Sequence, residues 1–153
     1  MRSPRTASAV AAGWAGSMVA IAAPIVNAAP PDRMVRIGIV SSGPPERTSI
    51  IDAAVKSRLR EHGYVEGKNA TFVRRYAFRL TDPMDTYVKD LLAESIDVLV
   101  TGCGWSTKVA MGATKTMPIV MVSVSDPVRR GYISSLARPG ANATGLSGMV
   151  DEL

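Results

Sequence analysis

The chain has 153 residues, of which 46% are hydrophobic and 20% charged, a balance typical of one globular domain rather than of a disordered segment. Its single cysteine and single histidine argue against a disulfide framework and a zinc site, so no metal or cofactor is expected. The net charge is +5, but lysine and arginine form no stripe that follows a phosphate backbone, so no nucleic-acid partner is expected.

Residues 1–28 have the pattern of a secretory signal peptide. Arg2 and Arg5 precede an alanine-rich apolar stretch, which ends in small residues at Ala28. This pattern predicts export to the periplasm with cleavage after Ala28, or alternatively after Ala29. Glycines and a proline interrupt the stretch, so a membrane anchor is less favoured. Removing Arg2 and Arg5 lowers the net charge by two, to +3.

Strands and helices alternate after this segment. A β-branched run predicts a buried strand over residues 35–40. Apolar residues at helical spacing then predict a helix over residues 48–62, with Thr48 or Ser49 as its N-cap. Side chains of alternating character over residues 70–78 predict a second strand near an edge of the sheet.

The alternation continues through the second half of the chain. The predicted elements are a helix capped by Thr81 or Asp82, a strand over 96–101, a short helix capped by Ser106, a strand over 119–124, a short helix near 128–136 and a strand over 142–146. Strands and helices that alternate in this way indicate parallel strands joined by right-handed crossovers. We therefore expect an α/β fold of three layers, α/β/α, with an open parallel sheet of about five strands, flavodoxin-like or Rossmann-like.

Three loops are predicted to meet at one edge of this sheet. Ligands of such sheets bind beyond the carboxyl ends of the strands. Each loop precedes a predicted helix, so free N–H groups and the positive end of the helix dipole favour an anionic or polar group there. The candidate ligand-binding residues are Ser41, Ser42, Gly43, Cys103, Gly104, Trp105, Ser106, Ser125 and Asp126. Residues of these types also serve as ordinary caps and turns, which is the alternative interpretation.

No catalytic residue is expected. Cys103 stands at a predicted helix start, where the pKa of a thiol falls and its reactivity rises, but no histidine lies near it in the sequence. A nucleophile-elbow motif and a complete dinucleotide-binding fingerprint are also missing from the sequence. A small enzyme that uses Cys103 is therefore the weakest of the functional hypotheses.

Six segments carry a resemblance to a known family. They are RIGI at 36–39, LREHGYVEGKN at 59–69, IDVLV at 96–100, MPIV at 117–120, VSDPV at 124–128 and SLARPGANATG at 135–145. In this order they resemble the periplasmic substrate-binding proteins of ABC transporters, of the tryptophan/tyrosine-receptor type. At residues 102–106 the chain departs from the Thr-Gly-Thr-Pro-Ala-like sequence of that family by carrying Cys103 and the bulky Trp105.

The resemblance implies a two-lobed receptor that closes by a hinge motion around a small polar solute, such as an aromatic amino acid. It also implies a partner, the ABC permease in the inner membrane. By position, the residues that match cleft-lining loops are Ser42, Gly43, Cys103, Ser106, Ser125 and Asp126. The chain resembles the N-terminal lobe alone, over residues 29–153, and so a truncated receptor that lacks the second lobe. The alternative is a cytoplasmic α/β domain that senses an effector or regulates a partner.

Overall fold

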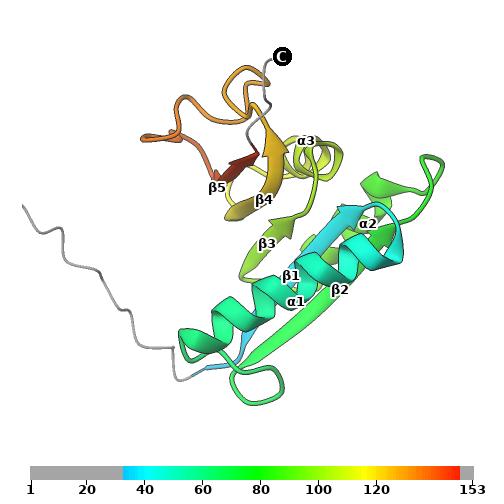
Figure 1. The fold of residues 1–153 in the computed structure, drawn as a ribbon, viewed down its shortest axis with the longest axis vertical. Coiled ribbons are helices and arrows are strands. Elements are labelled where there is room, and N and C mark those ends of the chain that lie inside the picture. Colours follow the sequence, from blue (N-terminus) through cyan, green and yellow to red (C-terminus); the bar gives the residue numbers. More distant parts are fainter. Residues whose placement is uncertain (1–32, 149–153) are drawn as a thin grey trace, which may run out of the picture.

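The computed structural model describes residues 33–148, so the predicted signal peptide lies outside the described residues. Five strands form one parallel sheet in the order β2-β1-β3-β4-β5. The strands are β1 (Val35–Ser42), β2 (Ala70–Ala77), β3 (Val98–Thr101), β4 (Ile119–Ser125) and β5 (Ala143–Gly148). The helices are α1 (Pro45–Glu61), α2 (Met84–Ala93) and α3 (Gly104–Ala113) (Figure 1). This α/β architecture confirms the predicted parallel sheet, and β2 lies at an edge as expected.

The three helices cover the two faces of the sheet. Helix α1 lies across one face, where Val55 and Leu59 pack against a buried cluster that includes Ile37 and Ile39 of β1. Helices α2 and α3 lie behind the sheet in Figure 1 and enclose the larger core. The buried side chains of that core include Val40, Val88, Leu91, Leu99, Ala110, Ile119 and Met121. Successive side chains of β1 thus enter different cores, which explains why the strand is apolar along most of its length.

The predicted starts of α1 and α2 are wrong in detail. Helix α1 begins at Pro45, where the fixed φ of proline suits a first helical position. Thr48 is buried, and its hydroxyl donates to the carbonyl of Pro45 at 3.0 Å instead of capping the helix. The carboxylate of Asp82 likewise accepts from the amides of Phe78 and Arg79, so α2 has no side-chain cap.

The short helix predicted near residues 128–136 is absent from the structure. This segment forms turns, in which the amide of Gly131 donates to the carbonyl of Val128 at 2.9 Å. Gly131 has a φ of +72°, in the left-handed region that ends a helix. The segment therefore folds as a loop that follows the carboxyl end of β4.

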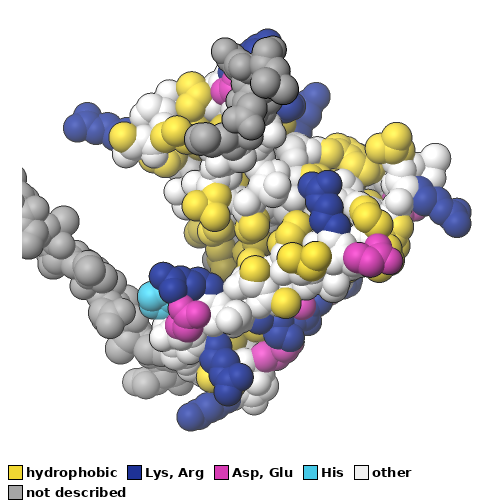
Figure 2. Space-filling view, in the orientation of Figure 1, with side chains coloured by type: hydrophobic (Ala, Val, Ile, Leu, Met, Phe, Trp, Pro, Cys, Tyr) yellow, Lys and Arg dark blue, Asp and Glu magenta, His cyan; other side chains and the backbone are white. Residues whose placement is uncertain are grey.

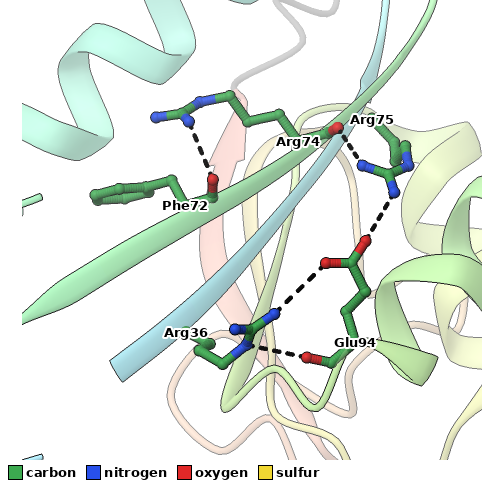
Figure 3. A network of polar contacts seen from close by, with 5 residues as sticks. All are labelled: Arg36, Phe72, Arg74, Arg75 and Glu94. Atoms are coloured by element: carbon green, nitrogen blue, oxygen red, sulfur yellow. Dashed lines mark hydrogen bonds and ion pairs between the residues drawn. The ribbon is translucent and has the colours of Figure 1, made fainter. Parts of the chain in front are cut away.

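Ion pairs link the first strands of the sheet to the turn that follows α2. Figure 3 shows Arg36 of β1 and Arg75 of β2 both reaching the carboxylate of Glu94, at 3.5 and 2.7 Å. The same Arg36 also donates to the carbonyl of Glu94 at 3.0 Å. In the described part of the chain, every ion pair involves residues between Arg33 and Asp97.

The face of the sheet that carries α1 remains partly open. An apolar groove of about 510 Å³ lies there between α1 and the strands β3, β4 and β5, and includes Val120, Val122 and Leu146. Hydrophobic side chains are visible in this region in Figure 2. No helix among residues 33–148 has both the length and the apolar character needed to cross a membrane.

Candidate functional site

A hollow of about 500 Å³ lies at the carboxyl edge of the sheet, where the three predicted loops meet. We call it the edge cleft. Its lining comes from the first turn of α1, the first turns of α3, the end of β4 and the loop that follows β4. The lining residues are Arg47, Cys103, Gly104, Trp105, Lys108, Ser123, Ser125, Arg130 and Tyr132. Parallel strands bring these segments together because all their carboxyl ends lie at one edge.

Cys103, rather than Ser106, caps the start of α3. The sulfur of Cys103 accepts from the amide of Ser106 at 3.4 Å, and the amide of Cys103 donates to Ser106 Oγ at 3.3 Å. This reciprocal pair is a capping box, with Ser106 as the third helical residue. The amides of Gly104 and Trp105 precede Ser106 in the first turn of α3. They have no acceptor within the helix, so they can donate hydrogen bonds to a ligand.

The capping pair also joins two of the three loops. Ser42 Oγ, at the end of β1, lies 3.1 Å from the sulfur of Cys103. Burial alone would raise the pKa of the Cys103 thiol, but hydrogen bonds with Ser106 and Ser42 outweigh it and lower that pKa below its ordinary value. The hydrogen bonds that join the two loops therefore also favour the thiolate form of Cys103.

The third loop is tied to α3 and to β4 by side-chain hydrogen bonds. The hydroxyl of Tyr132 donates to the carbonyl of Gly104 at 3.1 Å. Arg130 Nε donates to the carbonyl of Ser125 at 2.8 Å. These contacts hold the loop across the cleft, while the carboxylate of Asp126 accepts from the amide of Arg129 at 3.1 Å.

The sequence-predicted residues fall into three groups. Cys103, Gly104, Trp105 and Ser125 line the edge cleft. Ser42, Gly43 and Asp126 lie in the converging segments without lining it. Ser41 and Ser106 have side chains that are 1% and 0% exposed, so both lie within the fold beneath the cleft.

Sequence reasoning did not assign three cationic side chains and one aromatic side chain of the cleft to the site. These are Arg47, Lys108, Arg130 and Tyr132. One of them carried a usable signal, because Lys108 is four residues after Gly104 and so lies on the same face of α3, with its side chain tilted toward the helix start. The direction of the other side chains depends on the fold of the two loops.

The edge cleft is suited to binding a polar or anionic group. It offers hydroxyls, helix-terminal amides and cationic side chains, and Trp105 and Tyr132 add aromatic surface. Among residues 33–148, no three histidine, cysteine, aspartate or glutamate residues form a group that would hold a metal ion.

Comparison with known proteins gives consistent results. The sequence model of the ABC transporter substrate binding protein family matches residues 39–152. A tyrosine-binding protein of Clostridioides difficile is 30% identical over 89 residues, which are 58% of this chain and 26% of that protein.

Solved structures show the same fold. A ligand-free, open substrate-binding protein with adhesive properties from Clostridium difficile superposes with a TM-score of 0.72 at 24% identity, over 78% of this chain and 40% of that one. A conserved domain protein from Vibrio cholerae gives 0.71 at 28% identity over the same shares. An ABC domain in complex with L-Trp from Streptococcus pneumonia gives 0.69 at 24% identity, over 74% and 38%.

The chain therefore spans less than half the length of these relatives. The family model covers most of the chain, including all three loops of the edge cleft. The chain belongs to the family of ABC transporter substrate binding proteins.

Proposed function

We propose that this chain is a solute-binding lobe of an ABC-type importer and that it binds a small polar molecule, such as an aromatic amino acid, in the edge cleft. The observation that carries the proposal is the meeting of the start of α1, the start of α3 and the end of β4 with its following loop around one hollow, in a chain that belongs to the substrate-binding family. Its volume of about 500 Å³ lies within the usual range of small-molecule sites. The tyrosine-binding relative supports the ligand class.

The proposed binding needs a second lobe for full strength. This chain spans 40% or less of the length of its relatives, so we propose that a further lobe closes over the edge cleft. One lobe alone supplies part of the contacts and cannot enclose the ligand. We further propose that the mature lobe is periplasmic, follows the predicted signal peptide and delivers its solute to an inner-membrane permease.

Titration of the full chain with L-tyrosine or L-tryptophan tests the site. We expect weak binding, with NMR shifts at the amides of Gly104, Trp105 and Ser125. We expect the affinity measured by calorimetry to rise when a second lobe is added. Glycine serves as the control ligand because it lacks the aromatic ring. Shifts confined to the apolar groove around Val120 and Leu146 would refute the edge cleft as the site, and full-strength binding by this chain alone would refute the need for a second lobe.

N-terminal sequencing of the protein recovered from its own cells tests the location. A first residue at Ala29 or Pro30 is expected from cleavage after Ala28 or Ala29. Retention of Met1 would favour the alternative, a cytoplasmic sensing domain.

A further inference from the structure

We propose that the edge cleft recognises a carboxylate, held among Arg47, Lys108 and Arg130, and that an amino group contributes little to binding by this lobe. This inference rests on the proposed function and names the class of solute: a small carboxylate with an apolar or aromatic body.

Three cations from three separate elements line the cleft. Arg47 comes from the first turn of α1, Lys108 from the second turn of α3, and Arg130 from the loop after β4. None of the three takes part in an ion pair with another residue of 33–148. Arg130 uses Nε to hold the carbonyl of Ser125, which leaves the terminal nitrogens of its guanidinium for an anion.

No carboxylate lines the cleft. The acidic residues beside its lining in the sequence are Glu46 and Asp126. The side chain of Asp126 is committed to the amide of Arg129, and Glu46 lies exposed on the first turn of α1. A bound ammonium group would therefore lie near cations, with no carboxylate in the lining to balance its charge. Binding of an ammonium group is electrostatically unfavourable for this reason.

The remaining polar groups of the cleft act in the same direction. The first-turn amides of Gly104 and Trp105 point from the start of α3, where the helix dipole contributes partial positive charge. The hydroxyls of Ser123 and Ser125 are neutral and can donate to oxygen. Trp105 and Tyr132 offer apolar surface for the body of the solute.

Two compounds with the indole ring of tryptophan test the carboxylate and the amino group separately. Indolepropionate keeps the carboxylate of tryptophan and lacks its amine, whereas tryptamine keeps the amine and lacks the carboxylate. NMR titration of the full chain is expected to shift the amides of Gly104, Trp105 and Ser125 with indolepropionate and with L-tryptophan. Tryptamine is expected to leave these amides unshifted at the same concentration.

Neighbouring arginines provide matched variants. Arg130→Gln removes a cation of the cleft, whereas Arg129→Gln removes an exposed charge that does not line it. We expect Arg130→Gln to raise the Kd for indolepropionate roughly fivefold to tenfold, the loss typical of one partly solvated charged hydrogen bond. Arg129→Gln should leave that Kd within about twofold. The amide spectra of both variants verify their folds.

The outcomes separate this inference from the proposed function. Binding of tryptamine as strong as that of indolepropionate, or equal losses in the two arginine variants, would refute carboxylate recognition and leave the solute-binding lobe intact. Absence of shifts at the cleft with all three compounds would refute the proposed aromatic solute, and with it this inference.

Discussion

At the scale of single residues, Cys103 connects the fold to the site. Its sulfur caps α3 through the amide of Ser106 and contacts Ser42 of β1. The same hydrogen bonds lower the pKa of its thiol against the opposing effect of burial. One side chain therefore both caps a helix and joins that helix to the end of β1.

The pH dependence of alkylation tests this arrangement. Because the pKa of Cys103 is lowered, its reaction with iodoacetamide should reach half its maximal rate at a lower pH than that of free cysteine. Ser106→Ala should move that midpoint to higher pH, and by more than Ser42→Ala, because Ser106 contributes the larger lowering. A midpoint in the wild-type chain above that of free cysteine would contradict the hydrogen-bonded geometry.

Gly102 is required by a close approach between β1 and the loop after β3. A Cβ atom at Gly102 would lie 2.2 Å from Ser41 Oγ and 2.6 Å from Ser41 Cβ, and Ser41 is buried. Gly102→Ala is therefore expected to lower the free energy of unfolding by about 1–3 kcal/mol, the usual cost of overpacking.

Gly104 gives the matched control for this substitution. A Cβ atom there meets nothing within 4 Å, so Gly104→Ala should leave the free energy of unfolding unchanged or slightly higher. Urea denaturation of the two variants measures the difference. Equal stability of both would show that Ser41 moves aside without cost.

At the scale of elements, hydrophobic patterning predicted the strands well and the helix boundaries less well. The β-branched runs of β1, β3 and β4 are separated by helices, and strands connected in this way pair in parallel. The parallel sheet could therefore be predicted from the sequence. The start of α1 and the turns at Gly131 depend on local backbone geometry that apolar spacing does not report. The converging loops were predictable from topology, whereas the direction of Arg47 and Arg130 was not, because it depends on how each loop folds.

A reciprocal pair of hydrogen bonds joins the starts of β1 and β3. The amide of Arg36 donates to the carboxylate of Asp97 at 2.8 Å, and the amide of Asp97 donates to the carbonyl of Arg36 at 2.8 Å. Arg33 adds an ion pair with the same carboxylate at 2.7 Å. The hydrogen bond from Arg36 is the main cause that lowers the pKa of Asp97, with Arg33 adding to it and burial opposing.

The lowered pKa of Asp97 predicts an acid-dependent contribution to stability. The contribution is complete above the ordinary pKa of the carboxyl and is lost as the pH falls through the lower pKa of the folded state. Asp97→Asn should therefore lower the free energy of unfolding by about 1 kcal/mol near pH 7, with a smaller difference from wild type in acid. Asp90→Asn, on the exposed face of α2, is the control and should change little. A difference that stays constant with pH would contradict the assignment to ionised Asp97.

At the scale of the whole molecule, charge is distributed unevenly. The ion pairs of the described chain gather around β1, β2 and α1, whereas the cations of the edge cleft have no acidic partner among them. Most acidic side chains that form ion pairs are therefore already paired with cations outside the cleft. The cations that line the cleft at the carboxyl edge are left available to a ligand.

This distribution predicts different salt responses of binding and folding. Raising the ionic strength from about 0.01 M to about 0.15 M shortens the Debye length from about 30 Å to about 8 Å. The Kd for indolepropionate should rise several-fold, because attraction by the cleft cations is screened. The unfolding midpoint should change little, because exposed ion pairs contribute little to stability. Binding that is indifferent to salt would contradict a carboxylate held by the cleft cations.

Cys103 lines the edge cleft and is the one cysteine among the 153 residues of this chain. A thiol-reactive dye would therefore attach at a single place, beside the proposed ligand, without any engineered substitution. This chain thus already offers a one-step optical sensor, in which the emission of the dye would report a solute that enters the cleft.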